Sequence, residues 1–305
     1  MRNAFAQELT VIAKKDKKIV LLSGDIGNRL FDKFRKKFPK RFYNCGIAEA
    51  SMTGISSGLA HLGLRPITYT IATFNTIRCL EQIKLDVCYP DLPVIIVGTG
   101  AGLSYASLGS THHSLEDIAF LRTIPNLNIL CPSDPMEVKK LLRDAIKMKC
   151  PVYLRLGKKN EPVINHRKRI GNSDIIINGK TNLIISIGNI LKEAIEASKK
   201  LKKKRINNSV IDLRYVKPLD EKVLKKAFKN FKRIFVIEEH FVSGGAGSSI
   251  IEWANKNGFS SNKIYLFGAD NKFVHSSGSQ TAARDKLELS SDKIFKKIIK
   301  IIKTQ

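Results

Sequence analysis

Short apolar runs alternate with helical stretches along almost the whole chain, and this alternation constrains the fold more than any other feature. In the first half, the apolar runs are bounded by Gly, Pro or Asp and read KIVLLSG, RPITYTIAT, LPVIIVGTG, LNILCPSD and PVYLRLG. Between them, the pattern predicts helices over residues 47–62, 76–89, 114–123 and 135–147. Strands that are apolar throughout are typical of a parallel sheet covered by helices on both faces. The sequence therefore predicts a doubly wound α/β fold.

The alternation lapses over residues 158–174, which are polar and without periodicity, and then resumes. The later apolar runs NLIISIG, NSVIDLRYV, RIFVIEEH and IYLFG alternate with helices predicted over 190–204, 220–230, 248–257 and near 292–303. A chain of 305 residues is also long for a single hydrophobic core. We therefore predict a first domain over 1–160, a linker over 161–174, and a second, smaller α/β domain over 175–305.

Composition excludes several classes of protein. No apolar run approaches the roughly 18 residues that span a bilayer, and the first residues lack the apolar segment of a signal peptide. Five cysteines are scattered without paired spacing, which indicates reduced thiols and no zinc site. We expect a cytoplasmic protein that does not bind membranes.

The net charge of +26 raises the question of a nucleic-acid partner. Proteins that bind polyanions usually gather their positive charge on one element, whereas lysine here is spread along most of the chain. The densest run, KKLKKKR over 199–205, ends a predicted amphipathic helix, where lysine suits the helix dipole. The pattern favours a solvated basic surface over nucleic-acid binding and leaves an acidic partner or a phosphorylated substrate open.

Glu49 is the one charged residue in the stretch NCGIAEASMTGISSGLA. A carboxylate is almost never fully buried without a partner, because the loss of its hydration costs several kcal/mol. An exposed position in the first turn of the helix would suit its charge. This stretch alone leaves open whether Glu49 is exposed or is buried against a partner.

Two adjacent histidines, His112 and His113, end a loop in the stretch GSTHHSLED. They follow the carboxyl end of a predicted strand, which is where ligands of open α/β sheets bind. A neutral imidazole can donate and accept a proton near pH 7, which suits chemistry at a carbonyl or hydroxyl group. A metal would need further ligands at defined spacing, and the stretch offers none.

Other motifs allow more than one interpretation. The glycine loops SGDIGN and VSGGAGSS match neither the P-loop nor the dinucleotide fingerprint, and are interpreted as tight connections or interface loops. Phe74, at a strand end, is either a core residue or a platform for a stacked ring. Arg155, inside PVYLRLG, is either exposed by the pleat of the strand or binds an anion through its planar guanidinium.

Taken in order, these motifs resemble the smaller chain of a split transketolase, a family related to 1-deoxyxylulose-5-phosphate synthase and to the β subunits of 2-oxoacid dehydrogenases. The similar stretches are GIAEASMTGISSGLA, TFNTIRCLEQI, GSTHHSLEDIAFLRTIPNLNILCPSD, PVYLRLG, IDLRYVKPLDE and IEEHFVSGGAGS. They span nearly the whole chain. The resemblance implies a pyrimidine-binding domain followed by a transketolase C-terminal domain.

The resemblance also implies a site for thiamin diphosphate. In this family, the glutamate of GIAEA, here Glu49, hydrogen-bonds a ring nitrogen of the aminopyrimidine and favours the tautomer that removes the thiazolium proton. Phe74 holds the family's position for stacking on the pyrimidine. We expect Arg78 and Asp25 to bind the cofactor as well.

The substrate side of the site follows from the same resemblance. His112 matches the family's histidine that faces the substrate, and we expect His113 to bind substrate beside it. Arg155 matches an arginine near the phosphate or carboxylate end of the substrate.

One departure from the full-length family is informative. The motif that holds the diphosphate and Mg²⁺, a GDG followed by a distant Asn, is absent, and SGDIGN does not replace it. We therefore expect no metal ligand in this chain. A separate, larger subunit should carry the diphosphate and Mg²⁺ site, and two copies of each subunit should assemble into a heterotetramer.

The resemblance implies transfer of a two-carbon ketol unit between sugar phosphates or related sugars, including nonstandard ones. Two alternatives remain open at this point. The chain could be the β subunit of a decarboxylating 2-oxoacid dehydrogenase or of a synthase-like enzyme, or it could be a non-catalytic paralogue.

Overall fold

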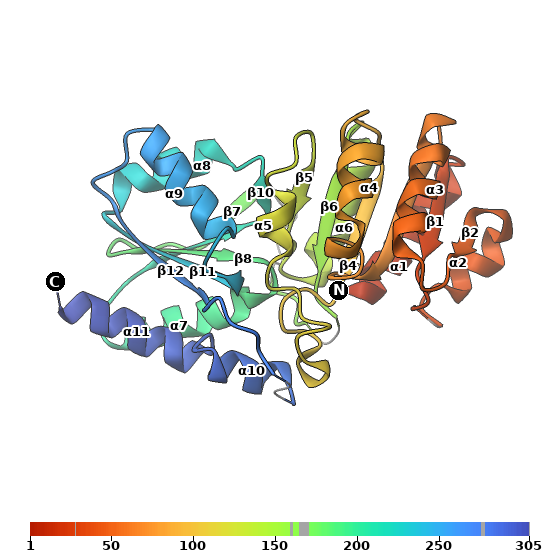
Figure 1. Ribbon diagram of the computed structural model, residues 1–305. Helices are drawn as coiled ribbons and strands as arrows, with labels where there is room; N and C mark the ends of the chain where they lie inside the picture. Colours follow the sequence, from red (N-terminus) through yellow and green to blue (C-terminus); the bar gives the residue numbers. More distant parts are fainter. Residues whose placement is uncertain (28, 159–160, 165–170, 276–277, 305) are drawn as a thin grey trace.

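The computed structural model describes residues 1–27, 29–158, 161–164, 171–275 and 278–304. Two sheets lie side by side, and helices cover both faces of each sheet (Figure 1). The sheet built mainly from the N-terminal half of the chain lies on the right of this view, and the second sheet lies on the left. The predicted α/β architecture is therefore confirmed.

The first sheet has seven strands in the order β10-β5-β6-β4-β3-β1-β2. Its parallel strands are β1 (Ile19–Ser23), β2 (Phe42–Asn44), β3 (Arg65–Ile71), β4 (Ile95–Thr99), β5 (Asn128–Leu130) and β6 (Val152–Leu156). Strand β10 (Tyr215–Lys217) comes from the second half of the chain and pairs antiparallel with β5 at one edge. Every residue of β1, β3, β4 and β6 is buried, which explains why these strands are apolar over most of their length.

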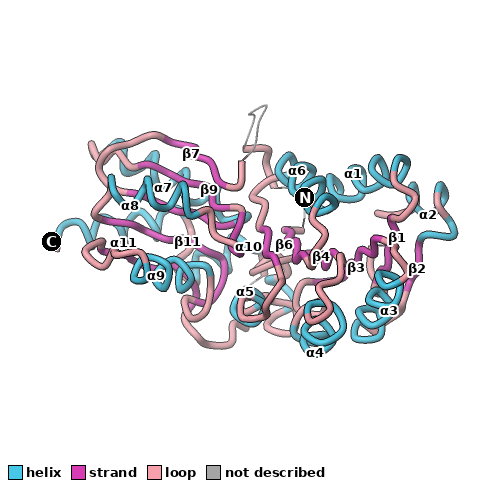
Figure 2. The backbone as a smooth tube through the Cα atoms, turned by 90° about the horizontal axis from the view of Figure 1, so that it is seen from above, coloured by secondary structure: helices cyan, strands magenta, loops and turns pink. Residues whose placement is uncertain are grey.

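Helices cover both faces of this sheet (Figure 2). Helices α1 (Arg2–Lys15) and α6 (Pro135–Lys147) pack together on one face, with the short α2 (Asp32–Lys37) near the β2 edge. The other face carries α3 (Glu49–His61), α5 (Asp117–Leu121) and α4 (Leu80–Gln82), which continues into a π-helical turn over Ile83–Cys88. Helix α6 begins where Pro135 occupies the first position and the Asp134 carboxylate accepts hydrogen bonds from two backbone N–H groups.

The second sheet has five strands in the order β12-β11-β8-β9-β7. They are β7 (Ser173–Ile177), β8 (Leu183–Ile187), β9 (Ser209–Leu213), β11 (Arg233–Phe241) and β12 (Lys263–Ala269), of which only β7 runs antiparallel to its neighbour. Helices α8 (Glu221–Asn230) and α9 (Ala246–Lys256) cover one face, and α7 (Leu191–Lys203) and α11 (Ser291–Lys303) cover the other. The short α10 (Gln280–Lys286) lies close to the junction with the first sheet.

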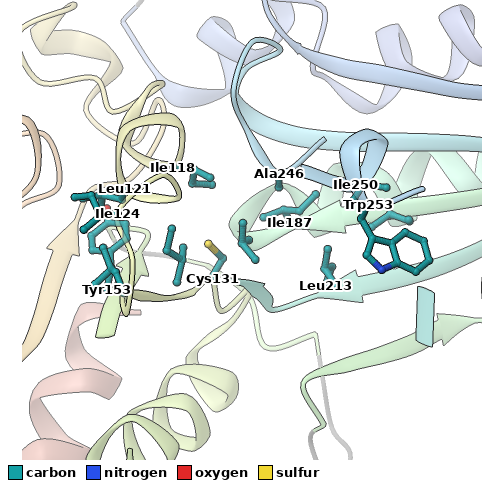
Figure 3. Close-up of a cluster of buried hydrophobic side chains, with 14 of the residues drawn as sticks. Ile118, Leu121, Ile124, Cys131, Tyr153, Ile187, Leu213, Ala246, Ile250 and Trp253 are labelled. Atoms are coloured by element: carbon teal, nitrogen blue, oxygen red, sulfur yellow. The ribbon is translucent and has the colours of Figure 1, made fainter. Parts of the chain in front are cut away.

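A continuous hydrophobic cluster joins the two halves of the molecule (Figure 3). From the first half it includes Ile118, Leu121, Ile124, Cys131 and Tyr153, and from the second half Ile187, Leu213, Ala246, Ile250 and Trp253. Because these side chains pack as one core, the second half is held in a defined position against the first.

Several elements differ from the sequence-based expectation, and the short elements α2, β2, β7 and α10 were not predicted. The strand predicted over 208–216 divides at Arg214, so that β9 joins the second sheet and β10 joins the first. The Arg214 side chain is buried at this division, where its guanidinium pairs with Glu137 at 2.7 Å and with Asp212 at 3.0 Å. Helix α1 was not predicted, and the helix predicted over 114–123 is confined to α5.

Strand β7 begins one residue before the end of the stretch predicted as a linker. Residues 165–170 of that stretch lie outside the described residues, so the boundaries at 160 and 175 stay predictions. Within the ranges that the structure describes, every helix is too short or too polar to cross a bilayer.

Candidate active site

Glu49 is the first residue of α3 and is only 3% exposed. One carboxylate oxygen, Oε2, accepts a hydrogen bond of 2.6 Å from Nη1 of Arg78, and Oε1 lies 3.5 Å from the Thr70 hydroxyl. The position in the first turn suits its charge. Of the two alternatives left open by the sequence, burial against a partner is the one observed. The position in the first turn of the helix is also found, but the side chain is not exposed there.

Phe74 lies in the turn that follows β3, half-buried rather than in the core. The side-chain amide of Asn75 holds this turn by donating to the Val97 carbonyl at 2.9 Å and to the Thr68 hydroxyl at 3.2 Å. The guanidinium carbon of Arg78 lies 4.3 Å from the centre of the Phe74 ring, which is a cation–π contact. Arg78 thus touches both Glu49 and Phe74.

His112 continues this row of contacts. Its ring meets the Phe74 ring edge to face, with the ring centres 5.2 Å apart, and its Nδ1 lies 3.0 Å from the Thr111 hydroxyl. Burial lowers the pKa of His112, and the Lys158 ammonium lowers it further, so the imidazole is neutral at pH 7. The structure therefore brings together Glu49, Arg78, Phe74 and His112.

Two side chains beside His112 were missed by the sequence reasoning. The Tyr105 ring centre lies 6.0 Å from that of His112, and the Lys158 ammonium lies 3.9 Å from the centre of the Tyr105 ring. Lys158 directly follows the apolar run PVYLRLG, a position that could have marked it as a residue at the carboxyl end of a strand. No sequence pattern singles out Tyr105.

His113 is buried, unlike its neighbour. Neither of its ring nitrogens forms a hydrogen bond of normal geometry with any residue that the structure describes. Burial lowers the pKa of His113, an effect that the Ala106 carbonyl partly offsets. Its expected contact with a substrate stays a prediction.

The loop that carries His112 is closed at its base by an antiparallel bridge between Gly102 and Ser114. Glu239, on β11 of the second sheet, accepts a hydrogen bond of 2.6 Å from the Leu103 N–H, and Arg284 and Gln280 also donate to its carboxylate. Gly102 has a φ of 62°, and a Cβ there would collide with this carboxylate. The second domain therefore holds the base of the loop.

Arg155 is buried in the same seam. Its Nε donates to Asp117 at 2.8 Å, and its Nη2 donates to the carbonyls of Ser114 and Glu239 at 2.9 and 3.0 Å. Burial has the largest single effect and would raise the pKa of Asp117, but the charge and hydrogen bond of Arg155, together with His240 and the Tyr153 hydroxyl, outweigh it and lower the pKa. These contacts join the two domains and give no support to the expectation that Arg155 binds a substrate anion.

Asp25 is exposed in the loop after β1, where its carboxylate accepts a 3.3 Å hydrogen bond from the Asn44 side chain. The preceding residue, Gly24, lies deeper. A Cβ there would be 2.8 Å from the Thr70 hydroxyl and 3.6 Å from Oε1 of Glu49. Asp25 is therefore near the rim of the site, and its expected contact with a cofactor stays a prediction.

In the part of the chain that the structure describes, no three His, Cys, Asp or Glu side chains converge as a metal-binding group. The site consists of a buried carboxylate, a half-buried aromatic ring and a neutral imidazole, with Arg78 lying across the first two.

Comparison with known proteins identifies the family. The family model of the transketolase pyrimidine-binding domain matches residues 1–163, and that of the transketolase C-terminal domain matches residues 171–294. One of the subunits of an apulose-4-phosphate transketolase from Phocaeicola vulgatus is 36% identical over 261 residues, which are 84% of this chain and 84% of that protein. The 1-deoxy-D-xylulose-5-phosphate synthase of Halothermothrix orenii is 33% identical, and the match covers 88% of this chain and 43% of the synthase.

A solved structure described as a split gene transketolase, inactive beta4 tetramer, superposes with a TM-score of 0.87 at 29% identity. The superposition covers 98% of this chain and 96% of that one. The chain belongs to the transketolase family, and it carries the pyrimidine-binding domain and the C-terminal domain of that family in this order.

Proposed function

We propose that this chain is the smaller subunit of a split transketolase that uses thiamin diphosphate to transfer two-carbon ketol units between sugar phosphates or related sugars. The observation that carries the proposal is the pairing of a buried carboxylate, Glu49, with a half-buried aromatic ring, Phe74, through one planar group that touches both. An aminopyrimidine is likewise planar and presents a basic ring nitrogen at its edge that can share a proton with a carboxyl group, so its shape and polarity fit these two side chains.

Each residue of the row has a role in this proposal. Glu49 hydrogen-bonds a ring nitrogen of the pyrimidine and supplies the proton that this nitrogen carries in the reactive tautomer, and Phe74 supports the face of that ring. Thiamin diphosphate, when bound, supplies the electron sink that ketol transfer requires. His112, neutral at pH 7, exchanges a proton with a hydroxyl or carbonyl group of the substrate.

A sugar phosphate is the proposed substrate class. The relative from Phocaeicola vulgatus is named for apulose 4-phosphate. In this chain, the Lys158 ammonium lies beside Tyr105 and lowers the pKa of His112, so a positive charge stands next to the proposed proton-transfer group. A phosphate group on the substrate would be attracted by this charge.

A larger subunit is the proposed partner, and it would bring the diphosphate-binding residues and Mg²⁺. The relative from Phocaeicola vulgatus is named as one subunit of its transketolase, which supports a second kind of subunit here. The helix that begins at Glu49, the π-helical turn over Ile83–Cys88 and the residues that flank these two elements also expose large apolar side chains, namely Ile47, Ile55, Leu85 and Tyr89. Exposed apolar groups beside half of a cofactor site suit an interface between subunits. Two copies of each subunit would form the heterotetramer.

Calorimetry with thiamin diphosphate and Mg²⁺ tests the proposal. We expect tight binding to the mixture of this chain with a larger subunit that carries the GDG motif, and weak or no binding to either subunit alone. The assembled enzyme should transfer ketol units between ketose and aldose phosphates. Decarboxylation of 2-oxoacids without such transfer would favour the dehydrogenase alternative, and tight cofactor binding by this chain alone would contradict the split site.

A further inference from the structure

Arg78 makes the two contacts that the proposed function assigns to the cofactor. Its Nη1 donates to Oε2 of Glu49 at 2.6 Å, and its planar guanidinium lies over the Phe74 ring at 4.3 Å. A pyrimidine ring that hydrogen-bonds Glu49 while it stacks on Phe74 needs the same carboxylate and the same neighbouring ring. A pyrimidine that used Oε2 and the face of Phe74 covered by the guanidinium would compete with Arg78 for one place.

The buried carboxylate explains why an arginine lies there. Glu49 is 3% exposed, and a buried carboxylate without a partner costs several kcal/mol. The Thr70 hydroxyl, 3.5 Å away, is at the limit of hydrogen bonding and cannot balance a full charge. Arg78 supplies that balance.

The same arginine is free to leave. Its side chain is 45% exposed, and its contacts among the described residues are those with Glu49 and Phe74. Arg155 differs in both respects, since it is 3% exposed and is tied by three hydrogen bonds to two domains. Arg155 is therefore fixed in place, whereas Arg78 can turn into solvent once another group pairs with Glu49.

We propose that Arg78 is a placeholder for the aminopyrimidine: it holds Glu49 and covers Phe74 until thiamin diphosphate arrives, and then swings away. This inference rests on the proposed function, and it replaces the expectation that Arg78 binds the cofactor directly. In this proposal, thiamin diphosphate binds only those protein molecules in which Arg78 is displaced. Its apparent dissociation constant is therefore the intrinsic constant divided by the fraction of molecules in that form. Arg78 therefore weakens cofactor binding.

Cofactor affinity tests the placeholder. In the complex with the larger subunit, we expect Arg78→Ala and Arg78→Gln to lower the dissociation constant of thiamin diphosphate about three- to tenfold, the range expected for a half-exposed ion pair combined with a cation–π contact. Arg143→Ala is the matched control, because Arg143 also joins a half-exposed guanidinium to a buried carboxylate, that of Glu8, at 2.6 Å. The complex that contains Arg143→Ala should bind thiamin diphosphate with the same dissociation constant as the unmodified complex.

The outcomes separate the two proposals. If the unmodified complex binds no thiamin diphosphate, both the proposed function and the placeholder are overturned. If it binds, and Phe74→Ala and Arg78→Ala both weaken binding, the cofactor site stands and the placeholder is overturned. An unchanged dissociation constant in both Arg78 variants also overturns the placeholder.

A crystal structure of the loaded complex gives an independent answer. The Arg78 guanidinium should be found away from both Glu49 and Phe74. If it remains bonded to Glu49 with the cofactor in place, the placeholder is overturned.

Discussion

The carboxylate of Glu239 accepts a 2.6 Å hydrogen bond from the backbone N–H of Leu103, across 136 positions of the chain. Glu239 belongs to the second domain, and Leu103 begins the loop that carries His112. The second domain contributes no side chain to the row of Glu49, Arg78, Phe74 and His112 among the described residues. Its contribution to the site is therefore to position that loop.

This relationship predicts the effect of Glu239→Gln. The amide can still accept from Leu103, but it loses the charge that pairs with the nearly buried Arg284. Loss of one partner of a largely buried ion pair should lower the free energy of unfolding by about 2–4 kcal/mol, measured by urea denaturation. In the assembled enzyme, kcat should fall several-fold while the dissociation constant of thiamin diphosphate stays unchanged.

Glu252→Gln is the control for this prediction, because Glu252 also pairs with an arginine, Arg122, but is 62% exposed. Its loss should cost less than about 1 kcal/mol. Equal destabilisation by the two variants, or a weaker cofactor affinity in Glu239→Gln, would contradict the positioning role.

Glu49→Gln should abolish most of the activity while leaving the assembly intact. An amide has nearly the same shape as the carboxyl group, but it cannot give a proton to the pyrimidine nitrogen and take it back, so kcat should fall by two or more orders of magnitude. Size-exclusion chromatography and initial-rate assays measure the two effects. Glu8→Gln changes another buried carboxylate that pairs with an arginine, outside the proposed site, and should keep normal turnover. Near-normal turnover of Glu49→Gln would exclude the proposed proton contact.

Phe74→Ala should weaken retention of the cofactor. A stacked aromatic contact contributes about 1 kcal/mol or more, so the dissociation constant of thiamin diphosphate should rise at least fivefold by calorimetry. Phe120→Ala, which removes an exposed ring on α5, should leave the constant unchanged. If Phe74→Ala also has no effect, the ring has only a packing role.

The sequence predicted the parts of the fold that depend on local pattern. Strands such as β4 and β6 lie between neighbouring strands and are covered by helices on both faces of the sheet. Because both faces are buried, these strands appear in the sequence as continuous apolar runs. Helix α1 also carries a local signal, since Phe5, Leu9 and Ala13 are buried at helical spacing, but the sequence reasoning did not use it.

The contacts that the sequence could not predict join distant segments. From the sequence, Arg155 was expected to bind an anion of the substrate. In the structure its guanidinium pairs with Asp117, which is 38 positions away in the chain. The apolar run that contains Arg214 looks like one continuous strand, and the sequence does not show that Arg214 pairs with Glu137 and Asp212 where the run divides between two sheets. Pairings of this kind depend on the assembled fold and leave no periodic signal in the chain.

The raised pKa of Glu116 should make the free energy of unfolding depend on pH. Burial and the neighbouring Asp117 charge raise the pKa of Glu116 to about 7, against an ordinary value near 4.5. The folded chain therefore binds more protons at this carboxyl than the unfolded chain between about pH 4.5 and pH 7. The contribution of Glu116 to stability thus falls as the pH rises through that window.

Glu116→Gln removes the ionisation. Relative to the unmodified chain, the variant should gain about 1 kcal/mol in the free energy of unfolding between pH 4.5 and pH 8, a figure reduced for the partial exposure of the side chain. Urea denaturation at both pH values measures this difference, and a difference that does not change with pH would show that Glu116 ionises normally in the folded chain.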